Sequence, residues 1–380
     1  MRIAIVGGGV VGLAIGWQLA RRGYSTTVFE RKHIGCGASG VAGGMLAAQA
    51  EAEPGEEALH QLLLQSQRMW PTFAQDLELA SSSAIGYRRE GTLLVAVNRD
   101  EQERLKAHHQ YQQSLGLNLT WLSGYEVRQR EPYLSRQIVG ALYSPEDHQV
   151  DNRLLLQALK TAFLQAGGIL REQCLVEALL IKDDQIYGLR NQDQEWSAEF
   201  VILATAAWPH LIHNLNPYVD LPIRPCKGQI LTVQMPPHQI LTAHVIWGED
   251  VYLIPRGDGR LLIGATVEEK GYDPDLTVGG VLDLLQKAWE ILPGLYDMPI
   301  RETQVGFRPR SPDDAPILGP TPLKGLYLAT GHHRNGILLA PLLAQAITPG
   351  RGSGGLPPGC QSFTLDRFHT SGFPDPALTL

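Results

Sequence analysis

The sequence has few cysteines: Cys36, Cys174, Cys226 and Cys360 are the four in 380 residues. They lie far apart and form no C-x-x-C pair, so neither a zinc site nor a disulfide framework is indicated. The chain also lacks an apolar run of about 18 residues, the length that a membrane-spanning helix needs. A cleavable leader is not expected, because an apolar strand pattern begins at Ile3. These absences predict a cytoplasmic protein with no metal site and no membrane span.

An excess of positive charge is absent too. The formal net charge is −7, from 32 Lys and Arg against 39 Asp and Glu, and the pI is about 5.9. No run of Lys or Arg could follow a phosphate backbone, so a nucleic-acid partner is not expected. Hydrophobic residues make up 44% of the chain, which is ample for a large core, and the length suggests about two domains.

The first thirty residues carry a nucleotide-binding pattern. An apolar run is followed by a glycine turn, a helical pattern and a second apolar run that ends at Glu30. Gly7 permits a sharp exit from the strand, Gly9 lets the backbone approach a pyrophosphate, and Gly12 lets the helix pack closely on the sheet. The helix N-terminus favours phosphates, and the Glu30 carboxylate can bind the hydroxyls of an adenosine ribose. The pattern predicts a Rossmann-type cradle but does not separate FAD from NAD.

Two later segments extend this prediction. Residues 35–45 are small and glycine-rich, as in a surface loop or in a chain that passes close to a large planar ligand, and we favour the ligand. Residues 325–340 repeat the order of strand, glycine turn and helix. We expect that helix to begin near Asn335 and to direct its positive end at the cofactor.

Strand patterns dominate from Lys227 to Thr266 and return at Glu302–Arg308, with a helical pattern at 278–292 between them. This block has no second nucleotide pattern, so we interpret it as a sheet that covers the substrate. The predicted fold class is α/β: a Rossmann-like domain with an inserted α+β substrate domain built on an antiparallel sheet. The predicted ranges are 1–48, 146–220 and 318–380 for the nucleotide domain, and 49–145 and 221–317 for the substrate domain.

Seven motifs resemble one known family over Ile3 to about Ile347. They are GGGVVG near the N-terminus, AGGML at 42–46, SQRMW at 66–70, VYLIPR at 251–256, LLIGAT at 261–266, VGFRP at 305–309 and GHHRNGILLAP at 331–341. Together they resemble the D-amino acid oxidase and glycine oxidase family of FAD-dependent amine oxidases, and within it the glycine oxidases of thiamine biosynthesis. The last two motifs are the most distinctive of the set.

The resemblance implies roles for individual residues. Tyr252 resembles the pocket tyrosine, Arg308 the arginine that clamps the substrate carboxylate, and Arg334 a second active-site arginine. Met45 resembles a residue at the boundary between flavin and substrate. The residues expected to hold FAD are Gly7, Gly9, Val10, Val11, Gly12, Glu30, Arg31, Ala38, Ser39, Gly43, Gly44, Met45, Val176, His332, His333, Arg334, Asn335, Gly336, Ile337 and Leu338. Related sarcosine oxidases often tether flavin through a cysteine near this last segment, and none lies at 326–350, so we expect non-covalent FAD.

The chemistry of the residues supports these roles. A guanidinium matches a planar carboxylate with two parallel charge-assisted hydrogen bonds, which suits Arg308 to an amino acid substrate. An ordinary surface arginine is the alternative, and Tyr252 could equally be a core residue. Asp250 replaces a histidine found in a well-known glycine oxidase. If Asp250 or Glu249 faces the pocket, it could bind the substrate ammonium and alter selectivity.

The expected reaction is oxidative deamination of glycine and other small amines such as sarcosine and D-alanine. A hydride leaves Cα for the flavin, the imine is hydrolysed to glyoxylate or a 2-oxo acid plus ammonia, and O2 is reduced to H2O2. A D-amino acid dehydrogenase or an N-methyl amino acid oxidase could use the same scaffold. An NAD-dependent dehydrogenase would explain the first motif alone. The resemblance also implies a homo-oligomer, often a tetramer, and a thiazole synthase as a possible recipient of the imine.

Overall fold

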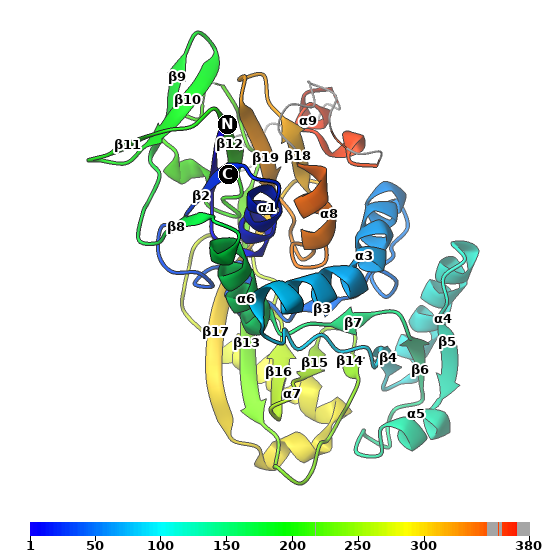
Figure 1. Ribbon diagram of the computed structural model, residues 1–380. Helices are drawn as coiled ribbons and strands as arrows, with labels where there is room; N and C mark the ends of the chain where they lie inside the picture. The colour runs from blue at the N-terminus through cyan, green and yellow to red at the C-terminus, as the bar shows by residue number, and fades with distance from the viewer. Residues whose placement is uncertain (217, 348–355, 357–358, 371–380) are drawn as a thin grey trace.

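The computed structural model describes residues 1–216, 218–347, 356 and 359–370. Two large sheets organise the chain, one in the upper and one in the lower half of Figure 1. The upper sheet has the order β18-β19-β12-β1-β2-β8, and every neighbouring pair in it is parallel except β18 and β19. Its strands are β1 (Arg2–Val6), β2 (Ser25–Phe29), β8 (Ile169–Arg171), β12 (Phe200–Leu203), β18 (Ile317–Pro320) and β19 (Leu326–Thr330).

Both faces of this sheet are covered, which explains the continuous apolar run of β1. Ile3 and Ile5 pack among the helices on one face, whereas Ala4 and Val6 pack on the other face beneath a small three-stranded sheet. The helices are α1 (Val10–Arg21), α3 (Glu57–Ser81), α6 (Asn152–Gln165) and α8 (Ala340–Ala346). The small sheet contains β9 (Ala178–Lys182), β10 (Gln185–Arg190) and β11 (Glu195–Ser197).

The lower sheet has the order β17-β13-β16-β15-β14-β4-β6-β5 and is mostly antiparallel. Its strands are β4 (Thr92–Ala96), β5 (Thr120–Ser123), β6 (Gly140–Ser144), β13 (Arg224–Gln234), β14 (Val245–Trp247), β15 (Tyr252–Pro255), β16 (Arg260–Gly264) and β17 (Ile300–Arg310). Leu253 and Ile263 pack on α7 (Val278–Ile291), whereas Tyr252 and Ile254 point to the opposite face. This alternation turns one face of the sheet toward the upper half.

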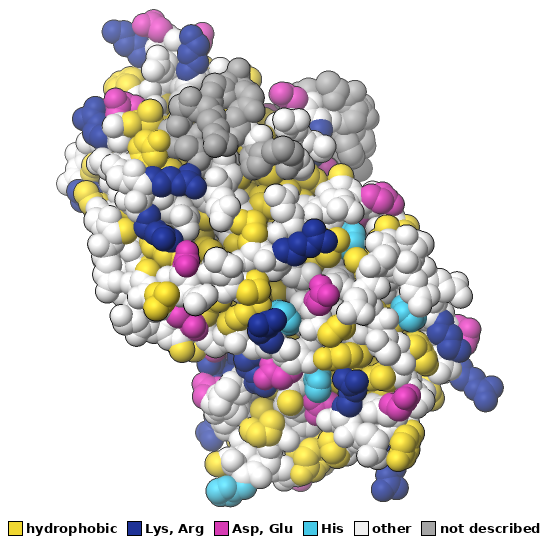
Figure 2. Space-filling model, turned by 45° about the vertical axis from the view of Figure 1, so that its right-hand side comes forward, with side chains coloured by type: hydrophobic (Ala, Val, Ile, Leu, Met, Phe, Trp, Pro, Cys, Tyr) yellow, Lys and Arg dark blue, Asp and Glu magenta, His cyan; other side chains and the backbone are white. Residues whose placement is uncertain are grey.

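Short elements complete the described chain. Two small elements, α2 (Ala38–Val41) and the β3–β7 pair (Met45–Leu46 with His148–Gln149), belong to the segments that line or support the site. The remaining elements are α4 (Arg99–Ser114), α5 (Gly124–Arg130), η1 (Pro209–Leu211), η2 (Pro293–Asp297), η3 (Gln361–Phe363) and α9 (Arg367–Thr370). No helix in the described part of the chain is long and apolar enough to cross a bilayer. Charges of both signs are interspersed on the face shown in Figure 2.

The predicted α/β class is confirmed, but two helix starts are wrong. The apolar spacing of residues 51–79 predicts a helix from Glu51, but α3 begins only at Glu57. The helix after β19, α8, begins at Ala340 rather than near Asn335, because Pro341 has no N–H to continue a helix from the preceding turn. Strands β1, β2, β13 to β17 and β19 lie in predicted segments, whereas β5, β6 and β18 were not predicted. The domain boundaries remain a prediction, and part of the 318–380 range lies outside the described residues.

Candidate active site between the two sheets

A cavity of about 900 Å³ lies between the carboxyl end of β1 and the eight-stranded sheet. The sheet order places β12 and β2 on either side of β1, so β1 ends at the point where the connections diverge. Ligands of open α/β sheets bind at such a switch point. The predicted residues that line the cavity are Gly9, Val10, Val11, Gly12, Ala38, Ser39, Gly43, Gly44, Met45, Asp250, Tyr252, Arg308, His332, His333, Arg334, Asn335, Gly336, Ile337 and Leu338.

Backbone geometry shapes the end of the cavity nearest α1. Gly7 has φ +116°, and a Cβ there would overlap the carbonyl of Ala204. A Cβ at Gly12 would overlap the carbonyl oxygen of Gly7. Both positions therefore require glycine if β1 and α1 are to pack as they do.

The start of α1 fits a phosphate. Gly9 precedes the helix in an extended conformation, and no side chain of Gly9 can cap it. The Val10 N–H donates to the Ser39 hydroxyl over 3.1 Å, which draws the small-residue segment against the helix start. The first-turn N–H groups and the partial positive charge of the helix thus border the cavity, as a pyrophosphate requires.

Four predicted cofactor residues lie outside the cavity lining. Gly7 is behind the turn, and Glu30 accepts hydrogen bonds from the N–H groups of Gly8 (2.9 Å) and Lys32 (3.0 Å). The Arg31 guanidinium lies 3.7 Å from the centroid of the Trp208 ring. Val176 is buried in the core beneath the three-stranded sheet. Their contacts with FAD remain predictions.

The turn that follows β19 borders the cavity from the other side. The backbone N–H groups of Gly336, Ile337 and Leu338 find no acceptor among the described residues, and all three residues line the cavity. Unpaired donors at the wall of a cavity favour a ligand oxygen there. Burial lowers the pKa of His332 to about 3 and that of His333 to about 4, so both imidazoles are neutral at pH 7.

Arg308 provides the positive charge at the sheet end of the cavity. It lies on β17 opposite Cys226 of β13, and its Nη1 donates to the Thr266 carbonyl over 3.1 Å. No described carboxylate forms an ion pair with it. Gly228 on β13 leaves room for the guanidinium, since a Cβ there would lie 2.6 Å from Nη1. The group is therefore held in place with donors still free for an anion.

Tyr252 lies beside this guanidinium. Burial raises the pKa of its hydroxyl, and the Arg308 charge opposes that shift. Gly264, directly opposite on β16, makes space for the ring, because a Cβ there would lie 2.6 to 2.7 Å from the ring edge and hydroxyl. Tyr252 therefore presents a neutral O–H next to a fixed cation, and its contact with a substrate carboxylate remains a prediction.

The sequence did not single out Glu51 as a site residue. Its carboxylate forms an ion pair with Arg334, and Glu56 lies 3.9 Å from the same guanidinium. Burial raises the pKa of the Glu51 carboxyl, and the neighbouring Arg334 charge opposes that shift. No local pattern around Glu51 indicates this pair, because Glu51 and Arg334 lie far apart along the chain.

Asp250 and Glu249 both line the cavity but already have partners. Asp250 accepts from Lys287 over 2.6 Å with 61% of its side chain exposed, and Glu249 accepts from Arg104 over 2.7 Å. These pairs place both acids at the outer rim rather than beside Tyr252. A contact between Asp250 and a substrate ammonium remains a prediction.

A buried carboxylate supports the turn that carries Glu51. Asp147 accepts hydrogen bonds from the N–H groups of Gln49 (3.0 Å) and Ala50 (2.7 Å) and from Gln67 Nε2 (2.7 Å). Burial raises the pKa of Asp147 to about 6, although these donors lower it. The position of Glu51 in the cavity thus depends on a group that does not line it.

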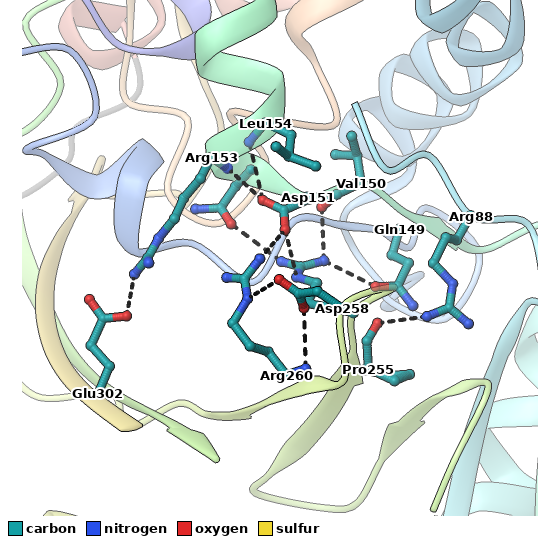
Figure 3. Close-up of polar contacts among 12 residues, drawn as sticks. Arg88, Gln149, Val150, Asp151, Arg153, Leu154, Pro255, Asp258, Arg260 and Glu302 are labelled. Carbon is teal, nitrogen blue, oxygen red and sulfur yellow. Dashed lines mark hydrogen bonds and ion pairs between the residues drawn. The ribbon is translucent and has the colours of Figure 1, made fainter. Parts of the chain in front are cut away.

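A second buried network joins the end of the Tyr252 strand to Gln149, Val150 and Asp151 beside α6 (Figure 3). Arg256, at the end of the same strand, donates over 2.7 Å to the carbonyl oxygen of Gly43. Asp151 accepts from Arg260 over 2.7 Å and also caps α6. Burial lowers the pKa of Arg256 to about 10, so it remains charged at pH 7. The network fixes the predicted cofactor segment relative to the predicted substrate strand.

Comparisons with known proteins identify the family of the chain. The family described as "FAD dependent oxidoreductase" (DAO) matches residues 2–349. The bifunctional protein ThiO/ThiG of Trichormus variabilis is 38% identical over 347 residues, which cover 91% of this chain and 52% of that protein. The glycine oxidase of Geobacillus kaustophilus is 35% identical over 343 residues, which cover 90% of each chain. The chain spans about half the length of the first curated relatives it matches.

Solved structures show the same similarity. The glycine oxidase from Geobacillus kaustophilus superimposes with a TM-score of 0.85 and 34% identity, covering 90% of this chain and 93% of that one. The glycine oxidase from Bacillus cereus gives a TM-score of 0.84 and 32% identity over the same shares. The predicted family and the predicted FAD cofactor are confirmed. Because the family model matches residues 2–349, the chain belongs to the DAO family of FAD-dependent oxidoreductases.

Proposed function

We propose that this protein oxidises glycine and other small amino acids, including sarcosine and D-alanine, to the corresponding imines. The observation that carries the proposal is the Arg308 guanidinium, which borders the cavity beside Tyr252 without a carboxylate partner among the described residues. A half-buried guanidinium with free donors favours an anion beside it. The relatives named as glycine oxidases support glycine as the amino acid.

The residues of the chain would act mainly by positioning. Arg308 would bind the substrate carboxylate through two parallel N–H donors, and Tyr252 would add a hydrogen bond from its neutral hydroxyl. The carboxylate would then be fixed at one end of the cavity, with Cα directed toward the segments expected to hold the flavin. FAD, when bound, supplies the acceptor for the hydride and passes the electrons to O2, which yields H2O2. No side chain needs to act as a base on the C–H bond.

The glycine cradle, the segment 38–45 and the turn 332–338 would hold FAD. None of the four cysteines, all within the described residues, lines the cavity, which supports a non-covalent flavin. Acid precipitation of the purified protein should leave the yellow colour in the supernatant. A yellow pellet would contradict non-covalent binding.

The direct test is peroxide release from glycine, sarcosine and D-alanine in parallel. We expect H2O2 in a one-to-one ratio with glyoxylate when glycine is the substrate. Turnover with an artificial electron acceptor but without H2O2 would indicate the dehydrogenase instead. If sarcosine alone releases no H2O2, the substrates are restricted to primary amines.

We also propose that the product imine is passed to a thiazole synthase. Relatives named as bifunctional ThiO/ThiG proteins support a link between this activity and a second one. Co-purification with the host thiazole synthase would test the first partner. Light scattering would test the predicted homotetramer. A monomer that does not retain the synthase would contradict them.

A further inference from the structure

A second cavity of about 640 Å³ adjoins the first and extends beneath α4 and the segment 50–54. Four residues line both cavities: Glu51, Trp247, Glu249 and Arg334. They are the boundary between the two spaces. Three of the four are charged and held in ion pairs, Glu51 with Arg334 and Glu249 with Arg104. Trp247 is the apolar member of the boundary.

The strand register places Trp247 next to Tyr252. Trp247 ends β14, opposite Tyr252 of β15 on one side and Leu94 of β4 on the other, so their side chains share one face. On the far side of Tyr252, Gly264 leaves the space into which the tyrosine ring leans, toward Arg308. Trp247 therefore closes the side of Tyr252 opposite to Gly264.

The indole is supported from behind by small and apolar side chains. It packs against the cluster that contains Ala47, Ala50 and Leu94. Ala47 also lines the first cavity, whereas Ala50 and Leu94 line the second. The indole is thus part of the wall that separates the two cavities.

We propose that Trp247 determines substrate size. With its carboxylate on Arg308 and Tyr252, an amino acid has room for a small Cα substituent before it meets the indole. Removing the indole would join the 640 Å³ space to the catalytic cavity and admit longer substituents. This inference rests on the proposed function, because it places a carboxylate ligand at Arg308.

The test compares wild type with Trp247→Ala and Trp247→Phe as flavin-loaded proteins. Binding of acetate and of 3-phenylpropanoate is followed by the change in the flavin absorption spectrum, which needs no turnover. We expect the affinity ratio of 3-phenylpropanoate to acetate to rise by about tenfold or more in Trp247→Ala, and less in Trp247→Phe. The kcat/KM ratio of D-leucine to glycine should rise in the same order.

Leu105→Ala is the matched control, because Leu105 lines the second cavity and not the first. It enlarges the second cavity without opening the boundary, so both ratios should stay at the wild-type value. Unchanged ratios in a folded, yellow Trp247→Ala protein would overturn the inference. If that variant does not fold, unchanged ratios in Trp247→Phe and Trp247→Leu would do so. A wild type that binds acetate but oxidises no amino acid would instead contradict the proposed function.

Discussion

The two ends of the catalytic cavity are lined by different kinds of groups. The end next to α1 consists mainly of backbone: glycine turns, a helix start and N–H groups without acceptors among the described residues. The sheet end consists of side chains, Arg308, Tyr252 and Trp247, that come from three different strands. A cofactor with fixed phosphates suits fixed backbone donors, whereas substrate selection depends on exchangeable side chains.

Each end of the cavity depends on a glycine in a close contact, but the atoms that an added Cβ would meet differ. At Gly7 an added Cβ would meet the backbone of Ala204, which cannot move without disturbing β12. At Gly228 it would meet the far end of the Arg308 side chain, which can turn away. The same substitution should therefore destroy one end of the cavity and only weaken the other.

Gly7→Ala should have the largest effect. The added Cβ overlaps the Ala204 carbonyl and the backbone has φ +116°, so we expect protein that purifies without flavin or fails to fold. Absorption spectra before and after addition of FAD provide the measurement. Gly37→Ala is the control, because Gly37 has φ −99° and no atom within 4 Å of its added Cβ. A yellow Gly7→Ala protein would show that the backbone end does not depend on this contact.

Arg308→Met should preserve the flavin and remove substrate binding. Two charge-assisted hydrogen bonds contribute about 3 to 6 kcal/mol, so kcat/KM for glycine should fall by roughly a hundredfold to ten-thousandfold. Arg308→Lys keeps the charge but not the paired donors, so its kcat/KM should lie between those of wild type and Arg308→Met. Steady-state peroxide assays measure the effect on substrate, and a flavin spectrum of each variant shows whether the cofactor end of the cavity is intact. A normal kcat/KM in Arg308→Met would remove Arg308 from the substrate site.

Asp147→Asn should change how stability depends on pH. Burial raises the pKa of Asp147 to about 6, above its ordinary value, so the group favours the folded state at low pH. That contribution is lost as pH rises through about 6, a loss on the order of 3 kcal/mol for a shift of this size.

The measurement is the denaturation midpoint from pH 4 to pH 7. Wild type should lose stability relative to Asp147→Asn as pH rises over this range, because the asparagine cannot ionise. Replacing the exposed Asp193 by Asn removes one negative charge elsewhere and should leave the wild-type slope. Parallel curves for wild type and Asp147→Asn would contradict the raised pKa.

Gly228→Ala should have the smallest effect of the four. The Cβ would lie 2.6 Å from Arg308 Nη1, so the guanidinium must shift. We expect KM for glycine to rise about tenfold while kcat and the flavin spectrum change little, since one misaligned donor costs of the order of 1 kcal/mol. Loss of flavin in this variant would mean that the two ends are not separable.

The difference between the two ends also decides what the sequence could reveal. Gly9 and Gly12 belong to a local pattern of strand, turn and helix, so the cofactor end was predictable from contiguous residues. Arg308 and Tyr252 were identified from the family motifs, and the structure places them side by side.

Glu51 and Trp247 were not identified, because their roles arise from contacts between distant segments. Glu51 reaches Arg334 across 283 positions of the chain, and Trp247 gains its place from the register of β14 with β15. The helix start near Asn335 was wrong for a local reason, the proline at 341. Local patterns thus predict backbone sites well and side-chain partnerships poorly.

The most direct measurement is an anaerobic titration of the purified yellow protein with glycine, followed by the visible flavin absorption. The account predicts that glycine bleaches the flavin in wild type and that admitted O2 restores the colour, while Arg308→Met stays yellow at the same glycine concentration. A wild-type flavin that is not bleached by glycine, sarcosine or D-alanine would contradict it.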